Sequence, residues 1–254
     1  MLGLLPNFLK FKKTNDLVRI GRDNDGGYLV SRNDIDNSDI LISFGISEDW
    51  SFEVDFINKK KIPLIAFDPF INKDYFLKKI KESICEFYRI KKLFYNLKLY
   101  FSYKKFFTGN RLHIQKFIGT NKLINHNKEH STIKKIFNDI KYSNIFLKID
   151  IEGSEYSLLD DLVYYQERIR GMVIEFHNCD VNIWKLEIFI KKFHLNLIHI
   201  HPNNYTGVNH NGLPITLELT FSKNNQLFNI DSLPHILDMP NQKLKNEIFI
   251  SFYN

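Results

Sequence analysis

Short hydrophobic runs alternate along the chain with segments whose hydrophobic residues recur at helical spacing. The runs rich in Ile, Leu, Val and Phe span 39–46, 63–70, 112–120, 144–153, 171–178, 195–204 and 214–221. Several are almost continuously hydrophobic, as strands buried on both faces of a parallel sheet are. The helical segments span 51–60, 131–141, 154–169 and 181–193. The alternation predicts an α/β fold that is doubly wound around a mostly parallel, seven-stranded, Rossmann-like sheet.

Two parts of the chain depart from this rhythm. No helical segment of comparable strength precedes 214–221, so we expect this last strand to be antiparallel. The segment 72–110 is dense in Lys, Phe, Tyr and Leu, and Ile80, Ile84 and Phe87 fall at helical spacing. It is therefore predicted to be a helical, basic and aromatic insertion of one or two amphipathic helices. Three interpretations are open: a helix pair that covers the core, a dimer surface, and a face for a membrane surface.

The remaining organisation is simple. No internal repeat and no linker rich in Pro, Gly or Ser divides the sequence, which predicts one domain over 1–254, with 1–38 as an N-terminal cap segment. Hydrophobic residues make up 44% and charged residues 25%, and this composition excludes disorder of the whole chain. Cys85 and Cys179 lie far apart, which excludes a disulfide scaffold and a zinc ribbon.

The charge is mildly basic. The 35 Lys and Arg residues exceed the 29 Asp and Glu residues and give a net charge of +6. This surplus favours an anionic ligand, such as a nucleotide-linked substrate, or an anionic surface. It is too small to indicate nucleic-acid binding unless it is concentrated on one face. Neither a secretory leader nor an apolar stretch of membrane-spanning length is present, so we expect a cytoplasmic protein, with peripheral membrane contact and homo-oligomerisation left open.

The predicted strand ends carry candidate ligand-binding residues, because ligands bind beyond the carboxyl ends of parallel strands. Gly45 lets the backbone approach a ligand closely, and Ser47 is suited to cap the next helix. Asp68, in AFDPF, either accepts hydrogen bonds from both hydroxyls of a ribose or forms an Asp-Pro turn. Together, Gly45 and Asp68 favour an adenosine-containing cofactor. The dinucleotide pattern GxGxxG is absent, which argues against a nicotinamide-dependent dehydrogenase.

The most distinctive segment is FLKIDIEGSEYSLLDDL, where a hydrophobic strand runs into several charged residues. Burial of Lys148 and Asp150 near a strand end costs free energy unless they are paired or bind something. Asp150 is therefore a functional candidate. Glu152 and Glu155 are either functional or structural, since Glu155 in the first turn of the next helix would complement the helix dipole.

The order of FGISEDWSFE, AFDPF, KIDIEGSEYSLL and VIEFH resembles the FkbM-like class of S-adenosylmethionine (SAM)-dependent O-methyltransferases. RIGRDNDGGYLV resembles a stretch that precedes the methyltransferase core in bacterial relatives. The likeness runs from about Arg19 to Phe221 and does not cover 72–110. It implies an enzyme that transfers a methyl group from SAM to a hydroxyl, of the type that modifies surface or capsular polysaccharides. The polar strand ends and the mild basic charge favour a sugar or nucleotide-linked sugar as the acceptor.

The resemblance also implies a site. It places SAM near Gly45, Ser47 and Asp68, with Gly119 and Thr120 near the adenine. A second group is implied to close over the cofactor or the acceptor, and it consists of Arg22, Asp25, Gly26, Gly27 and Tyr28. The alternative for the GlyGlyTyr sequence is a hairpin turn.

Histidines at two strand ends suggest how a hydroxyl could be activated. Strand alternation places Glu175 and His177 on one face, and His199 and His201 on one face. His177 or His201 could act as general base, because histidine titrates near neutral pH. Alternatively, Mg²⁺ or Mn²⁺ could lower the pKa of the hydroxyl, held by Asp150, Glu175 and His201, with His177 as a substitute ligand.

Asn203 and Asn204 end the sixth predicted strand and either bind a polar acceptor such as a sugar or serve as turn residues. Two other functions compete with methyl transfer: a nucleotide-sugar reductase on a similar sheet, and a non-catalytic assembly or binding subunit that uses 72–110 as its interface. Strand-end acids and histidines favour an enzyme over the second of these.

Overall fold

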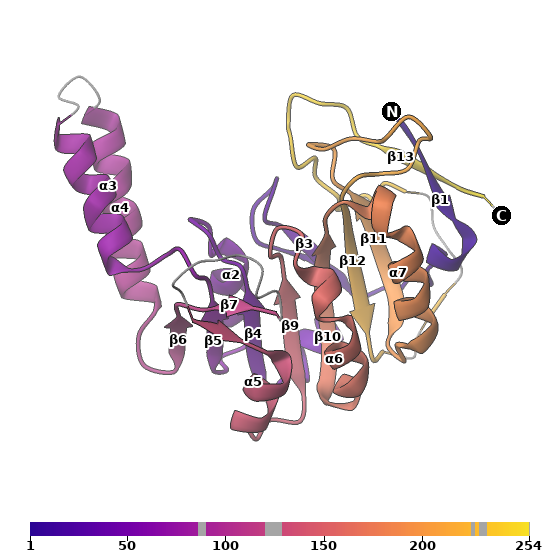
Figure 1. Ribbon diagram of the computed structural model, residues 1–254, viewed down its shortest axis with the longest axis horizontal. Coiled ribbons are helices and arrows are strands. Elements are labelled where there is room, and N and C mark those ends of the chain that lie inside the picture. Colours follow the sequence, from indigo (N-terminus) through magenta and orange to yellow (C-terminus); the bar gives the residue numbers. More distant parts are fainter. Residues whose placement is uncertain (86–89, 120–128, 225–226, 229–232, 254) are drawn as a thin grey trace.

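A computed structural model describes residues 1–85, 90–119, 129–224, 227–228 and 233–253. Its central sheet has the order β11-β12-β10-β9-β4-β5-β6 (Figure 1). The strands are β4 (Ile40–Phe44), β5 (Leu64–Phe67), β6 (Arg111–Ile114), β9 (Ile145–Ile149), β10 (Ile169–Phe176), β11 (Asn196–Pro202) and β12 (Leu217–Ser222). Only β12 runs antiparallel to its neighbours, β10 and β11, as predicted for the last strand. The predicted mostly parallel, seven-stranded, Rossmann-like sheet is confirmed.

Two predicted elements are divided. The run 112–120 forms β6 and then β7 (Phe117–Ile118), which pairs with β8 (His130–Ser131), because the chain turns where the Lys116 amide bonds to the Ile114 carbonyl. The segment 154–169 forms η2 (Glu155–Ser157), α6 (Leu159–Tyr164) and η3 (Gln166–Arg168) in place of one helix. The Ser157 hydroxyl donates to the Ser154 carbonyl, a local bond that competes with regular helix formation.

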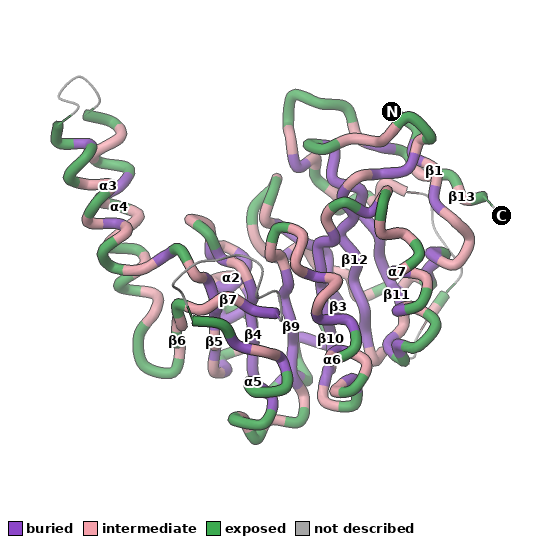
Figure 2. The backbone as a smooth tube through the Cα atoms, in the orientation of Figure 1, coloured by how far each residue is buried: buried purple, intermediate pink, exposed green. Residues whose placement is uncertain are grey.

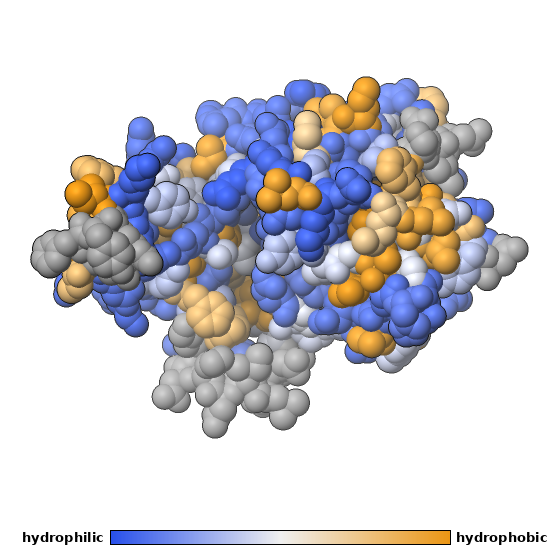
Figure 3. Space-filling model, turned by 90° about the horizontal axis from the view of Figure 1, so that it is seen from above, coloured by the Kyte–Doolittle hydropathy of each residue, from blue (hydrophilic) through white to orange (hydrophobic). Residues whose placement is uncertain are grey.

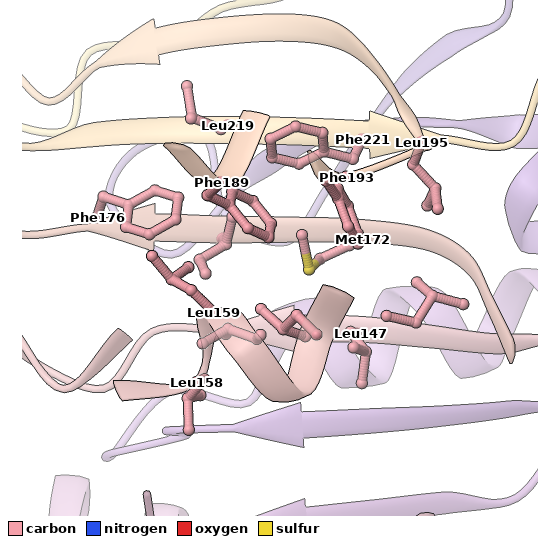
Figure 4. Packing of buried hydrophobic residues seen from close by; sticks show 14 of the residues in the cluster. Leu147, Leu158, Leu159, Met172, Phe176, Phe189, Phe193, Leu195, Leu219 and Phe221 are labelled. Atoms are coloured by element: carbon pink, nitrogen blue, oxygen red, sulfur yellow. The ribbon is translucent and has the colours of Figure 1, made fainter. Parts of the chain in front are cut away.

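Helices cover both faces of the sheet (Figure 1). On one face, α5 (Ile133–Asp139), α6 and α7 (Cys179–Lys192) pack on the sheet through the largest hydrophobic cluster, part of which is shown in Figure 4. On the other face, α2 (Ser51–Lys59) packs beside the hairpin of β2 (Leu17–Ile20) and β3 (Tyr28–Ser31). The short helix α1 (Arg32–Asp36) follows this hairpin. The sheet itself is almost wholly buried (Figure 2).

The insertion forms an antiparallel helix pair, α3 (Lys73–Cys85) and α4 (Ile90–Phe106), that projects from the edge of the sheet (Figures 1 and 2). Its base packs through Phe76, Tyr103 and Phe107 on Trp50. The predicted helical insertion is confirmed and consists of two helices, but the interpretation as a cover for the core holds only for this base. No helix in the described residues is long and hydrophobic enough to cross a membrane.

The two ends of the chain lie side by side. Strand β1 (Leu2–Pro6) pairs in parallel with β13 (Phe249–Tyr253), and η1 (Asn7–Leu9) follows β1. The segment before β13 lies against the ends of β11 and β12, where Asp238 is 3.2 Å from His199 and Asn241 donates to Glu218 at 2.6 Å. Residues distant in sequence therefore share one edge of the sheet.

Candidate active site

A cavity of about 780 Å³ opens at the carboxyl ends of β4, β5 and β9, where ligands bind in open parallel sheets. This volume lies in the range of about 300–1,000 Å³ that is typical of small-molecule sites. Of the residues predicted from sequence, the cavity wall includes Arg22, Asp25, Gly26, Gly45, Ser47, Asp68, Asp150 and Glu152. Residues chosen by the strand-end rule and residues implied by the resemblance therefore line the same cavity.

Gly45 lies where the end of β4 touches the end of β9. Its φ is +79°, and a Cβ atom there would lie 1.7 Å from the Asp150 carbonyl oxygen. The Asp150 amide also donates to the Phe44 carbonyl at 2.9 Å. Only glycine permits this close approach together with the left-handed backbone.

Asp68 organises the loop after β4. Its Oδ2 accepts from the amides of Ile46 and Ser47 at 3.3 and 2.9 Å, and its Oδ1 accepts from those of Phe70 and Ile71 at 2.8 and 3.1 Å. A carboxylate has about four acceptor sites, so these bonds occupy all of them. The structure therefore shows the Asp-Pro turn, and the predicted bond to a ribose requires that a backbone amide be displaced.

Backbone strain gathers at these strand ends. Among the described residues, three other than glycine have a left-handed φ: Ser47 at 43°, Glu152 at 55° and Asn178 at 51°. They follow β4, β9 and β10, three neighbouring strands, and the first two line the cavity. Such conformations cost about 1–3 kcal/mol each and cluster at functional sites. The strained backbone positions thus lie at the same edge of the sheet as the cavity.

Lys148 and Asp150 form a buried pair beside the cavity. The Lys148 ammonium donates to the Gly45 carbonyl and lies 3.7 Å from Asp150 Oδ2. Burial lowers the pKa of Lys148, but the carboxylates of Asp150 and Glu53 outweigh it and raise that pKa above its usual value. The charge of Lys148 is therefore matched within the protein, while the half-buried Asp150 side chain, 26% exposed, still faces the cavity.

Tyr28 lies behind Asp150 and joins it to Glu175. The phenol oxygen is 3.2 Å from Asp150 Oδ2 and 3.0 Å from Glu175 Oε2, and Asn203 donates to Glu175 Oε1 at 2.9 Å. Burial raises the pKa of Glu175 well above its usual value, and Asp150 and Glu218 raise it further. Since the phenol has one proton, both contacts are satisfied when a protonated Glu175 donates to Tyr28 and Tyr28 donates to Asp150.

His177 is surrounded by carboxylates. Its Nδ1 is 3.1 Å from Glu155 Oε1, and its Nε2 is 3.5 Å from Glu152 Oε2 and 3.9 Å from Glu175 Oε1. Burial lowers the pKa of His177, but the hydrogen bond to Glu155 and the nearby carboxylates outweigh it and raise that pKa to about 9. His177 is thus protonated near neutral pH in this arrangement, whereas a general base must be neutral.

This pKa predicts a pH-dependent contribution to stability. A raised histidine pKa stabilises the fold fully below the unfolded value of 6.5, and the contribution is lost as pH rises to about 9. We expect the free energy of unfolding of the native protein to exceed that of His177→Gln most at low pH, and the difference to shrink across this window in urea titrations. His210→Gln, at an exposed histidine, is the control. A difference that stays constant with pH would contradict the prediction.

Glu155 has a structural role in the KIDIEGSE segment. It is fully buried, and its Oε1 accepts from the amides of Ile151 and Gly153 at 3.1 Å each, as well as contacting His177. This carboxylate therefore closes the loop after β9 and fixes His177 beside it.

His201 lies in a separate, buried network. Its Nδ1 is 3.1 Å from Glu218 and its Nε2 is 3.5 Å from Glu247, and it does not line the cavity. Burial lowers the pKa of His201, but Glu218 and Glu247 outweigh it and raise that pKa well above its usual value. Asn204 bonds through its amide to the backbone of Gln242 and Lys245. The geometry supports the turn alternative for Asn204.

The loop between β2 and β3 supplies another wall of the cavity. The two strands pair antiparallel from Ile20↔Tyr28, so GlyGlyTyr ends a hairpin turn, as its alternative interpretation held. Arg22 reaches Asp49 at 2.9 Å, and Asp25 accepts from Asn241 at 3.2 Å. Arg22 and Asp25 line the cavity, whereas Tyr28 does not.

The remaining predicted cofactor contacts lie near β7. Thr120 lies outside the described residues. Gly119 bonds through its amide to the Ser131 carbonyl and does not line the cavity, but Phe117 and Ile118 just before it do. Phe117 meets Phe70 edge-to-face at 5.4 Å, which gives this end of the cavity an aromatic wall.

Two acidic residues escaped the sequence analysis, one on the cavity wall and one in the separate network of His201. Glu48 binds the hydroxyl of Tyr75 and the ammonium of Lys79, which attaches α3 to the loop after β4. Glu218 lies between His201 and Asn241. The ion pair and hydrogen bonds join segments that are distant in the sequence, so no local pattern could reveal them; the only local signal for Glu48 was its place in FGISEDWSFE.

The structure brings together some, but not all, of the ligands predicted for a divalent cation. Asp150, Glu152 and His177 offer ligand atoms within 4.8 Å of one another, and they are the only such group in the described part of the chain. The substitute ligand His177 thus lies with Asp150, while His201 lies with Glu218. A cation ligand must be a neutral imidazole, and the surrounding carboxylates favour the protonated one. The cation stays a prediction.

No family model matches this chain, and no curated protein matches it. Among solved structures, it is similar to precorrin-6y C5,15-methyltransferase from Geobacter metallireducens, with 12% identity over 76% of this chain and 84% of that chain and a TM-score of 0.38. It is also similar to an rRNA methylase from Streptococcus thermophilus (10% identity, 73% and 87%, TM-score 0.36) and to a fibrillarin/Nop5p complex (8%, 73% and 72%, 0.36).

Proposed function

We propose that this protein transfers a methyl group from SAM to a hydroxyl of a saccharide or nucleotide-linked saccharide. The observation that carries the proposal is the cavity at the carboxyl ends of β4, β5 and β9, walled by Gly45, Asp68 and Asp150. These residues belong to three of the motifs that resemble the FkbM-like methyltransferases, and the sheet around them has the expected strands, with an antiparallel β12.

The cavity fits a nucleoside-containing cofactor. The close approach of Gly45 to Asp150 holds the start of the loop after β4 against the end of β9, and Gly45, Ile46 and Ser47 line the cavity there. Phe70, Phe117 and Ile118 offer an aromatic and aliphatic wall for an adenine ring. Phe117 and Ile118 come just before Gly119, which the resemblance places near the adenine. The charged residues Arg22, Asp25, Asp49, Asp150 and Glu152 lie elsewhere on the wall, and their hydrogen-bonding groups suit a polyhydroxylated acceptor.

When bound, SAM supplies an electrophilic methyl group. The acceptor oxygen must lose its proton as it forms the new bond to carbon and the carbon–sulfur bond breaks. In our proposal, Asp150 Oδ1 takes this proton, because Tyr28 and Lys148 contact Oδ2 on the other side of the carboxylate. In this proposal, His177 stays protonated and Glu175 stays neutral while Asp150 takes the proton. His201 has a structural role. This assigns to Asp150 the role for which His177 and His201 were the sequence candidates.

Calorimetric titration with SAM tests the proposal directly. We expect saturable binding of SAM and of S-adenosylhomocysteine, because both present the same nucleoside to the cavity. NADH and NADPH are the controls and should not bind, since the glycine pattern for a dinucleotide is absent. Absence of SAM binding at millimolar concentration would refute the proposal, and binding of NADPH instead would favour the reductase.

Assignment of the acceptor needs a second measurement. Mass spectrometry of reactions with candidate nucleotide-sugars and oligosaccharides should show one added methyl group on the acceptor. If SAM binds but only non-hydroxyl acceptors are methylated, the cofactor assignment stands and the saccharide assignment fails.

A further inference from the structure

The solvent-facing side of α4 carries large hydrophobic residues and lysines together. Ile90, Phe94 and Phe101 are 61%, 67% and 62% exposed and lie on one side of the helix; we call them the hydrophobic stripe. Lys91, Lys98 and Lys105 recur every seven residues, about two turns, and form a lysine stripe beside it. The opposite side of α4 packs on α3, where buried Asn96 donates to Ser83 at 2.7 Å. The exposed stripes are therefore not needed for the packing of the hairpin.

The basic surplus of the chain is concentrated on this hairpin. Helix α4 contains no acidic residue, and α3 has Asp74 and Glu82. Against these two stand nine lysines in the two helices: Lys73, Lys78, Lys79, Lys81, Lys91, Lys92, Lys98, Lys104 and Lys105. The excess of seven exceeds the net charge of +6 of the whole chain. Figure 3 shows hydrophobic and hydrophilic residues side by side at the projecting end of the hairpin.

We propose that this face of α4 binds the surface of an anionic phospholipid bilayer. The hydrophobic stripe would enter the boundary between head groups and acyl chains, and the lysine stripe would meet the phosphate groups. A helix that lies in a membrane interface combines these two features, and lysine stems can extend along the hydrophobic residues while the ammonium stays at the head groups. Because α4 has lysines and no acidic residue, we expect its partner to be anionic.

Two other partners fit less well. A second copy of the chain docked through the same face would bring lysine stripes together, with no acidic residue on either α4 to pair with them. A nucleic acid would meet no arginine on α4, although arginine is the side chain suited to bidentate phosphate contacts, and the aliphatic Ile90 has no base-stacking role.

The bound membrane would lie beside the cavity. Tyr95 on α4 lines the cavity, and Tyr75 and Lys79 on α3 hold Glu48 of the loop after β4. The hairpin therefore connects the proposed membrane face to the cavity wall. The proposal does not depend on which reaction the cavity supports.

Flotation of the full-length protein with lipid vesicles tests the proposal. We expect the protein to float with phosphatidylcholine vesicles that contain phosphatidylglycerol, to remain behind with phosphatidylcholine alone, and to be released at high salt. The variant Lys91→Gln/Lys98→Gln/Lys105→Gln should bind anionic vesicles about a hundredfold more weakly, because each lysine near an anionic leaflet contributes about fivefold. The control Lys10→Gln/Lys12→Gln/Lys243→Gln removes the same charge from exposed positions elsewhere and should retain most of the binding.

A second variant distinguishes insertion of the hydrophobic stripe into the bilayer from electrostatic attraction of the lysines alone. Phe94→Ala/Phe101→Ala keeps every lysine and should weaken vesicle binding by at least about tenfold. Circular dichroism should show native helix content in all variants, because the replaced side chains are exposed. Equal loss in the control triple variant, no binding to anionic vesicles, tighter binding to single-stranded RNA at the same salt, or a dimer that only the stripe variants dissociate would each overturn the proposal.

Discussion

Asp150→Asn should reduce the rate of methyl transfer by about 10²–10⁴-fold, the usual contribution of a positioned general base. The amide retains the size of the carboxylate but cannot take a proton from the acceptor hydroxyl. SAM should still bind, because Gly45 and the aromatic wall are unchanged. The measurement is single-turnover transfer across pH, together with calorimetric affinity for SAM.

The matched control for this prediction is Asp139→Asn, at an exposed position of α5. It should leave turnover unchanged. Thermal unfolding must show that Asp150→Asn is folded, since Lys148 loses the nearest of the carboxylates around it and keeps Glu53. Full turnover in folded Asp150→Asn would remove Asp150 from catalysis. If a chelator abolished activity and Mn²⁺ restored it, Asp150 would instead be a cation ligand.

Local sequence was enough to bring together three residues that line the cavity. Hydrophobic runs defined the strands, and the rule that ligands bind beyond their carboxyl ends selected Gly45, Asp68 and Asp150, which do wall one cavity. That inference needs only strand boundaries and direction, which the pattern contains. The division of 112–120 and of 154–169 was not predictable from hydrophobicity, because single hydrogen bonds such as that between Ser157 and Ser154 decide it.

The environment of each histidine depends on residues far away in the chain. Strand alternation correctly places His199 and His201 on one face of β11, but their partners Asp238 and Glu247 come from a segment that returns to the sheet after β12. Similarly, the hairpin containing Tyr28 was visible in the sequence, yet the face of the sheet that it covers was not. The pKa of His177 likewise depends on neighbouring carboxylates, which raise it to about 9, and strand alternation alone does not show them.

The same limit applies to Asp68. An acidic residue after the second strand has two uses that the sequence cannot separate, since both require a carboxylate at the same place. The choice depends on whether backbone amides reach its oxygens, and four of them do. Asp68 would therefore influence cofactor binding through the loop that contains Ile46 and Ser47.

Gly45→Ala should abolish measurable SAM binding and lower the free energy of unfolding by at least about 3 kcal/mol. The left-handed backbone alone costs a residue with a Cβ about 1–2 kcal/mol. The added methyl group would also lie 1.7 Å from the Asp150 carbonyl oxygen, so β4 and β9 must separate at the floor of the cavity. Urea denaturation gives the stability change, and calorimetry gives the affinity for SAM.

Gly207→Ala is the control that has the backbone effect without the clash. Gly207 has a φ of +78°, almost the same as Gly45, but nothing lies within 4 Å of the position that its Cβ would take. It should therefore lose only the backbone contribution of about 1–2 kcal/mol and retain SAM binding. Equal destabilisation of the two variants, with SAM binding intact in both, would mean that the contact between Gly45 and Asp150 does not shape the cofactor site. A larger loss in Gly45→Ala alone would locate that site at the junction of β4 and β9.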